Sequence, residues 1–183
     1  HGGRFQERMP SLICGVGSVF LVFYISVVST VVAPLQCLSN PNGKATTRDY
    51  QSVVCWETDE HRGMVILGLV ALLAPLSFLT WCAVVVSKFP EKMAMGDTVF
   101  LRGYAFLFVR YRVEVYWYGL VHMARSLLMA LAPIIPNIIA QILIVQVILI
   151  MQVIANAKLN PWRDTHVNNA DTIATTAVLV FTC

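Results

Sequence analysis

The stretch from Arg110 to Asn156, RYRVEVYWYGLVHMARSLLMALAPIIPNIIAQILIVQVILIMQVIAN, decides how this chain folds. Two arginines and a group of aromatic residues lead into an apolar run that contains His122 and Arg125. A Pro-Asn turn then leads into a second apolar run that contains three glutamines. Apolar runs joined by a short turn are typical of a helical hairpin in a membrane, where each backbone polar group is satisfied inside its own helix. The stretch therefore predicts two membrane-spanning helices with polar side chains between them.

The composition of the whole chain places it in the same class. Of 183 residues, 57% are hydrophobic and only 13% are charged, a balance typical of integral membrane proteins. The formal net charge of +3 is too small to indicate binding of nucleic acid. The chain begins without a methionine and stops inside an apolar run, so we expect it to be a fragment that continues beyond both ends.

Charge-free apolar runs divide the chain into predicted membrane spans. At about 1.5 Å per residue, roughly 20 helical residues cross a hydrocarbon core of about 30 Å. Four runs are long enough, and the last run is interpreted as the start of a truncated span. The predicted fold is an all-α polytopic membrane helix bundle in which residues 1–183 form a single transmembrane helical region. Its four complete spans and the start of a fifth are predicted at residues 12–33, 64–87, 115–135, 138–155 and 172–183.

A polar loop at residues 34–63 joins the first two spans and contains Cys37 and Cys55 on either side of the turn Pro41-Asn42-Gly43. If the loop is extracytoplasmic, the two cysteines are expected to form a disulfide, because that side of a membrane is oxidising. Closing such a loop stabilises a fold by about 3 kcal/mol. The alternative is a pair of free thiols.

The distribution of charge predicts how the chain is threaded. The N-terminal lead-in and the loops after the second and fourth spans would lie on one side of the membrane. They contain nine basic residues: Arg4, Arg8, Lys88, Lys92, Arg102, Arg110, Arg112, Lys158 and Arg163. The 34–63 loop has three basic residues and four acidic ones: Lys44, Arg48, Arg62, Asp49, Glu57, Asp59 and Glu60. Basic residues concentrate in cytoplasmic loops. We therefore expect a cytoplasmic N-terminus and an extracytoplasmic loop that contains Cys37 and Cys55.

Two further features of these segments carry predictions. The cytoplasmic loop at 88–114 contains an apolar stretch, 99–109, that is too short to span and is predicted to be a helix at the membrane interface. The alternative is that 99–109 begins a longer third helix. Pro75 lies near the middle of the second span, where it removes a backbone hydrogen bond and kinks the helix. Pro75 is a candidate hinge, although such kinks are common scaffolding in membrane helices.

Polar side chains inside the third and fourth spans are the main candidates for function. Because a helix advances 100° per residue, the third span places its polar residues on one face, and the fourth places Gln141, Gln152 and Asn156 close together on another. We expect the two faces to meet. We call these residues the polar seam: Tyr118, His122, Arg125, Ser126, Gln141, Gln152 and Asn156.

Arg125 is the main reason to expect a function at the polar seam. It lies ten residues into its predicted span, near the bilayer midplane, where an arginine costs roughly 2.5–3.5 kcal/mol to insert. Such a residue must face protein or water, which is typical of a permeation path, a ligand site or a gating charge. The alternative is a structural arginine held by carbonyls and glutamines of neighbouring helices.

No pattern in the chain indicates an enzyme. The four histidines are scattered without metal-ligand spacing, and no nucleophile motif or phosphate-binding glycine loop occurs. We therefore expect no catalytic residue, cofactor or metal site. The expected partners are the lipid bilayer, cations and the flanking domains of the same chain, without nucleic acid; an oligomer is compatible with this organisation.

Short motifs spread along the chain are similar to those of one family. In chain order they are Pro34-Leu35-Gln36-Cys37, Pro41-Asn42-Gly43, Cys55, Tyr111-Arg112, Tyr116-Trp117-Tyr118, Arg125-Ser126-Leu127-Leu128, Gln141, Pro161-Trp162, Asn169 and Asp171. Together they resemble the transient-receptor-potential-like (TRP-like) membrane region of large fungal and protist surface proteins. The resemblance implies a multi-pass helical bundle, in the plasma membrane, with cation-channel or related transport activity. The alternative is a non-conducting anchor or receptor region that relays from extracellular domains.

Overall fold

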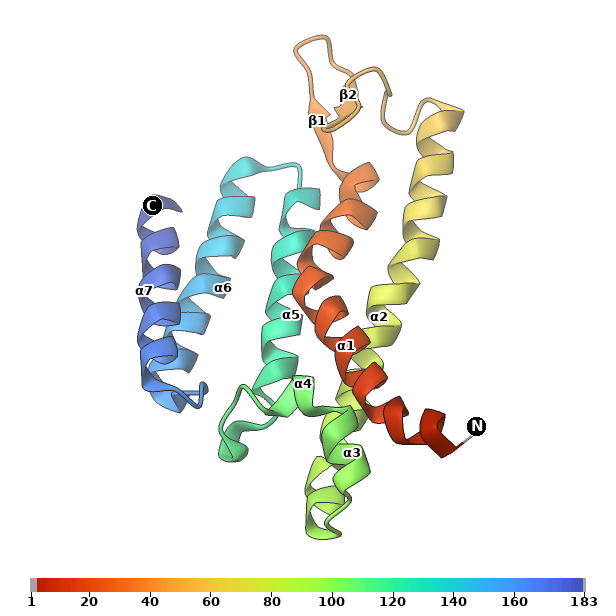
Figure 1. Ribbon diagram of the computed structural model, residues 1–183. Coiled ribbons are helices and arrows are strands. Elements are labelled where there is room, and N and C mark those ends of the chain that lie inside the picture. Colours follow the sequence, from red (N-terminus) through yellow and green to blue (C-terminus); the bar gives the residue numbers. More distant parts are fainter. Residues whose placement is uncertain (1–2, 183) are drawn as a thin grey trace.

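Five long helices dominate the computed structural model, which describes residues 3–182 (Figure 1). The helices lie side by side and alternate in direction, so successive connections fall at opposite ends of the molecule. The protein is therefore all-α apart from one short hairpin. The long helices are α1 (Gly3–Val32), α2 (Asp59–Ala94), α5 (Tyr118–Leu131), α6 (Ile138–Leu159) and α7 (Thr165–Thr182).

Short elements fill the connections. An antiparallel hairpin of β1 and β2 lies at one end of the molecule, together with the turn between α5 and α6. The N-terminal end of α1, the helices α3 and α4, and the connection between α6 and α7 lie at the other end. The bounds are η1 (Ala33–Leu35), β1 (Cys37–Ser39), β2 (Ala45–Thr47), α3 (Thr98–Gly103), α4 (Ala105–Phe108), η2 (Val113–Val115) and η3 (Ala132–Ile134).

Residues that satisfy the free backbone groups set the helix ends. The hydroxyl of Thr58 accepts a hydrogen bond from the backbone N–H of His61 and caps α2. The side-chain oxygen of Asn137 accepts from the N–H groups of the first turn of α6. At the other end of α6, Asn160 adopts the left-handed conformation with φ of 41° and stops the helix. The hairpin of α5 and α6 is thus delimited by local chemistry.

In the described part of the chain, three helical segments are long and apolar enough to cross a membrane: residues 8–35, 59–94 and 138–159. Only 11% of the most apolar window of the third segment is buried within the protein, and an exposed apolar surface of this size requires lipid or another protein to cover it. The segment 118–134 is apolar but shorter. Its helix α5 has 14 residues and is about 21 Å long, because Pro133 and Pro136 prevent it from continuing.

Helix α1 lies at the centre of the packing. It contacts α2, α3, α4 and α5, and its buried side chains form the middle of the main hydrophobic core. Two glycines permit close approach. A Cβ on Gly17 would lie 2.4 Å from the ring of Phe106, and a Cβ on Gly68 would lie 2.7 Å from the carbonyl oxygen of Val31. The buried core residues are Tyr24, Val28, Val32, Cys82, Val85, Val86, Phe106, Leu107, Met123 and Ala130.

Two segments differ from the sequence-based prediction. The apolar stretch 99–109 is not one helix, since α3 and α4 meet at a break at Tyr104. Phe106 and Leu107 are buried in the core, so one side of this stretch packs against α1. Helix α7 begins at Thr165 and not at residue 172, because the carboxylate of Asp164 accepts from the backbone N–H of His166 and caps the start of the helix.

Candidate functional site

A group of buried and half-buried side chains joins α5, α6 and α7 through hydrogen bonds. Tyr118 lies in the first turn of α5, Gln152 and Asn156 lie one turn apart on α6, and Asp171 lies on α7. Trp162 comes from the connection between α6 and α7. We call these five residues the polar cluster.

Hydrogen bonds run through the polar cluster from one helix to the next. The hydroxyl of Tyr118 donates to the side-chain oxygen of Asn156 and accepts from Nε2 of Gln152 at 2.8 Å. Nδ2 of Asn156 donates to Oδ2 of Asp171 at 2.8 Å, and Nε1 of Trp162 donates to the same oxygen at 3.1 Å. Each of these side chains therefore has a hydrogen-bond partner within the polar cluster. Tyr118 and Asn156 are 0% and 1% exposed, so these bonds form away from water and fix the positions of three helices.

The connections on either side of the polar cluster pair with each other. Tyr111 and Trp162 form a short antiparallel bridge, in which the N–H of Arg112 donates to the carbonyl of Pro161 at 2.9 Å. The rings of Tyr111 and Trp162 are 5.1 Å apart. The side chain of Asn168 accepts from the N–H of Trp162 and donates to its carbonyl. These contacts close the end of the polar cluster that faces the connections.

Burial changes the chemistry of Tyr111. Its ring is 5% exposed and lies 5.4 Å from the ring of Tyr118. Burial disfavours the phenolate and, with a smaller contribution from Tyr118, raises the pKa of Tyr111 to about 12. The side chain is therefore a neutral packing group over the physiological range of pH.

Arg125 lies near the middle of α5, and its guanidinium is the exception to this satisfied arrangement. Its Nε and Nη1 atoms are buried and have no hydrogen-bond partner within residues 3–182. Buried N–H groups without an acceptor keep their desolvation cost, about 1–3 kcal/mol each. The site therefore contains a half-buried cation with two unpaired nitrogens, near a cluster that contains the carboxylate of Asp171.

The other residues of the predicted polar seam have different surroundings. Of the seven, the structure brings Tyr118, Gln152 and Asn156 into direct contact. Nε2 of Gln141 donates to the carbonyls of Pro133 and Ile135 in the turn before its own helix, so Gln141 does not meet Arg125. The hydroxyl of Ser126 donates to the carbonyl of His122 one turn earlier and serves its own helix. His122 is half-buried on the same helix.

Asp171, Trp162 and Asn168 belong to this site, although sequence reasoning did not place them there. The predicted start of the last helix, residue 172, left them in a loop. With α7 beginning at Thr165, however, Asn168, Asp171 and Thr175 recur at spacings of three and four and lie on one face. That polar stripe within an otherwise apolar helix is the pattern that could have revealed them.

The disulfide between Cys37 and Cys55 is formed, as the sequence predicted. His61 lies beside it and is completely buried. Its Nδ1 accepts from the N–H of Trp56 at 3.1 Å, so Nε2 carries the proton and donates to the carbonyl of Pro34 at 3.0 Å. Both cysteine sulfurs are bonded to each other and are not thiolates, so this group of three residues does not ligate a metal in this state.

The candidate hinge Pro75 is buried in α2, against α1. Its carbonyl accepts a hydrogen bond from the hydroxyl of Tyr24 at 3.4 Å. Because proline has no N–H, the carbonyl of Ala71 lacks its helical donor. The contact with Tyr24 ties the proline to the centre of the bundle.

Together, these features define an all-α protein with helices apolar enough for a membrane, a disulfide-closed hairpin at one end and a polar cluster between α5, α6 and α7. Comparison of the chain with protein-family models, with curated proteins and with solved structures finds no match in any of the three.

Proposed function

We propose that this chain is the transmembrane region of a TRP-like multi-pass protein that works as a cation channel or a related transport module. In this proposal α1, α2, α5 with η3, and α6 are four complete spans and α7 is the beginning of a fifth. The polar seam between α5 and α6 is the part that controls passage. The motifs that resemble the TRP-like family support this, because Tyr111, Tyr118, Trp162 and Asp171 come from separate motifs and gather at one place.

The threading belongs to the same proposal. The basic connections at residues 88–112 and 158–163 lie at the end of the molecule opposite the disulfide hairpin (Figure 1). The positive-inside rule then assigns the former end to the cytoplasm and the hairpin to the outside. An oxidising exterior is also where a disulfide persists. We assign the protein to the plasma membrane on the resemblance alone.

Arg125 is the observation that carries the proposal. Arg125 is half-buried near the middle of α5, and two of its guanidinium nitrogens, Nε and Nη1, are buried without a hydrogen-bond partner within residues 3–182. A cation retained at such a cost within a membrane bundle is most often part of a path for ions or of a gate. A fixed positive charge opposes the passage of cations, so Arg125 would act as the electrostatic barrier that holds the closed state.

A second candidate function, a non-conducting anchor or receptor region, has its own observation. The polar cluster is closed on itself, since Tyr118, Gln152, Asn156 and Trp162 all use their polar atoms on one another or on Asp171. A closed network of this kind holds helices in register and transmits force from an extracellular domain. It does not need a permeation path.

Cation flux into sealed liposomes that contain the purified protein separates the two functions. The transport proposal predicts flux above that of protein-free liposomes. Arg125→Ala removes the barrier charge and is expected to raise the flux about tenfold, whereas Arg125→Lys keeps the charge and the low flux. Arg62→Ala is the matched control, because Arg62 is exposed and pairs with Asp59 at the other end of the protein. Flux equal to that of protein-free liposomes for all variants would support the anchor.

A further inference from the structure

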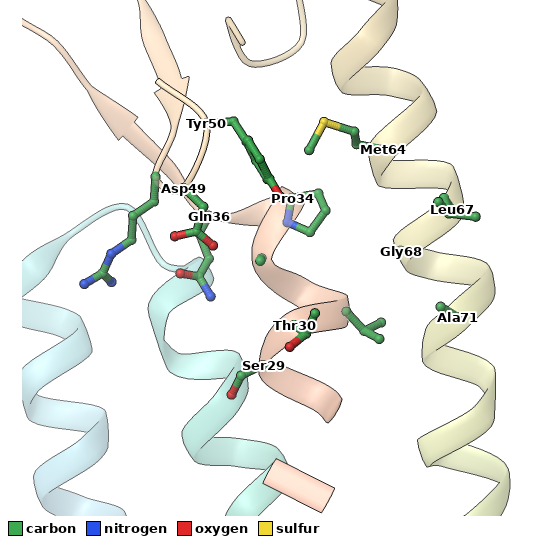
Figure 2. A pocket seen from close by; sticks show the side chains of 13 residues that line it. Ser29, Thr30, Pro34, Gln36, Asp49, Tyr50, Met64, Leu67, Gly68 and Ala71 are labelled. Carbon is green, nitrogen blue, oxygen red and sulfur yellow. The ribbon is translucent and has the colours of Figure 1, made fainter. Parts of the chain in front are cut away.

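A cavity of about 640 Å³ lies where the ends of α1 and α2 meet the 34–63 loop. Figure 2 shows the ring of Tyr50 beside Pro34 at the end of α1, with the side chain of Met64 pointing toward this end from α2. The polar ends of Gln36 and Asp49 lie on the other side of the end of α1 (Figure 2). The cavity therefore has a polar edge and an apolar wall.

A close contact between the two helices forms part of the cavity wall. Gly68 on α2 lies against the carbonyl of Val31 on α1, where a Cβ would come within 2.7 Å of the oxygen. Helix α1 ends one residue later at Val32 and the chain continues through η1 into the hairpin, whereas α2 extends further toward that end (Figure 1). The cavity is open at its side, where Leu67 and Ala71 of its wall are exposed, Leu67 by 71%. An occupant can therefore reach the cavity from the surface of the apolar helices.

The polar edge has one charge of each sign. Arg48 and Asp49 both line the cavity, and both side chains are exposed. Other charges of this end form ion pairs, Lys44 with Glu57 at 3.0 Å and Arg62 with Asp59 at 3.6 Å. Within residues 3–182 the side chains of Arg48 and Asp49 have no such partner. Arg48 and Asp49 are thus available to bind a ligand that has one negative and one positive group.

We propose that this cavity binds a membrane phospholipid with a zwitterionic headgroup. Arg48 would bind the phosphate and Asp49 the ammonium group, while the glycerol and upper acyl chains lie along the wall formed by Leu67 and Ala71. The cavity lies where the polar loop meets the first apolar turns of α2, which is the depth of headgroups in a bilayer. The site rests on the proposed membrane location and not on transport.

Native mass spectrometry of the purified chain tests this site. The protein is extracted from bilayers with equal amounts of dioleoylphosphatidylcholine and dioleoylphosphatidylglycerol, and the retained lipid is weighed. The wild type is expected to retain phosphatidylcholine. Arg48→Gln is expected to lose about tenfold in retention of both lipids, because both have the phosphate. Asp49→Asn is expected to lose phosphatidylcholine alone and so to reverse the preference.

Matched variants guard against a general effect on folding or on lipid association. Ala71→Trp fills the apolar wall and is expected to abolish retention, whereas Ala74→Trp, at another exposed position of α2 outside the cavity, is expected to keep it. Arg62→Gln is the control for lost positive charge. Mass measurement of the intact disulfide and the helical circular dichroism signal establish that each variant is folded.

Several results would overturn the proposal. Equal retention in the two tryptophan variants would show that the lipid lies elsewhere, as would an equal loss in Arg62→Gln and Arg48→Gln. Preferential retention of phosphatidylglycerol by the wild type would refute the zwitterionic assignment. Displacement of the lipid by free glycerophosphocholine at the same concentration would show that the apolar wall contributes nothing, and that the ligand is a soluble headgroup.

Discussion

Nδ2 of Asn156 on α6 lies 2.8 Å from Oδ2 of Asp171 on α7, and this bond sets how the last two helices pack. The same carboxylate oxygen accepts from the indole of Trp162 at 3.1 Å. One acceptor therefore holds two donors from different segments, of which Asn156 is buried and Trp162 is half-buried. Loss of the carboxylate would leave both donors without a partner.

Replacement of Asp171 by alanine is expected to lower the free energy of unfolding by about 2–4 kcal/mol, because buried donors without acceptors keep their full desolvation cost. Asp171→Asn keeps an acceptor oxygen and should cost about half as much. Hydrogen exchange of α7 amides in detergent, together with thermal unfolding, measures both. Asn169→Ala changes an exposed neighbour and is the control. Equal effects of Asp171→Ala and Asn169→Ala would contradict the role given to the carboxylate.

The contact between Tyr118 and Asn156 is expected to show energetic coupling. A double-mutant cycle of Tyr118→Phe and Asn156→Ala should give an interaction free energy of about 1 kcal/mol, because each change removes the same buried bond. Thermal unfolding of the two single variants and the double variant supplies the measurement. Additive effects within about 0.3 kcal/mol would show that this bond contributes nothing.

Arg125 and Gln141 are expected to show no coupling. The amide of Gln141 is taken up by the carbonyls of Pro133 and Ile135, so Arg125→Ala and Gln141→Ala should be additive within about 0.3 kcal/mol. The same unfolding measurement tests this pair. A coupling as large as that of Tyr118 with Asn156 would mean that the two halves of the polar seam meet along their whole length.

Periodicity and charge predicted the helical hairpin and the disulfide, because both depend on local sequence. The apolar runs around Pro133 and Pro136 end where proline and asparagine end them in the structure. Cys37 and Cys55 lie in one polar loop, and a hairpin brings them together. The helix ends and the disulfide could therefore be predicted from residues that lie close together in the sequence.

Contacts between distant segments were harder to predict. Period alone placed Gln141 with Gln152 and Asn156 on one helix face, but Gln141 lies in the first turn, where unpaired carbonyls of the preceding turn compete for its amide. The amino-acid composition of α1 also gave no indication that this helix lies at the centre of the packing. It follows from close approaches such as that of Phe106 to Gly17, whose partners are far apart in the sequence.

Loss of the disulfide should destabilise the end of the protein that contains the hairpin. The two cysteines are 18 residues apart, and release of a loop of this length costs about 3 kcal/mol in the chain-entropy model. Cys37→Ser with Cys55→Ser, or mild reduction, should lower the unfolding temperature and increase hydrogen exchange around His61, which packs on the bridge. Cys14→Ser is the control, because Cys14 is a free thiol in α1. Unchanged exchange at His61 after reduction would show that the hairpin holds without the bridge.

Alkaline titration is expected to reveal the burial of Tyr111. Its pKa is raised to about 12 in the folded protein, against about 10 for an unfolded chain. The folded state therefore keeps its proton over this range while the unfolded state loses it. The stabilising contribution is intact below pH 10 and is lost as the pH rises to about 12, an effect of about 2–3 kcal/mol. Thermal unfolding as a function of pH should show this loss for the wild type.

The matched variants isolate that single phenol. Tyr111→Phe keeps the ring between Tyr118 and Trp162 and removes the ionisable group, so its unfolding temperature should fall less between pH 10 and 12. Tyr50→Phe, at an exposed ring, should follow the wild type. If Tyr111→Phe and the wild type lost stability in parallel over this interval, the phenol of Tyr111 would have to ionise with equal ease in the folded and unfolded states. The close packing around Tyr111 of the connection before α5 and the connection between α6 and α7 would then be contradicted.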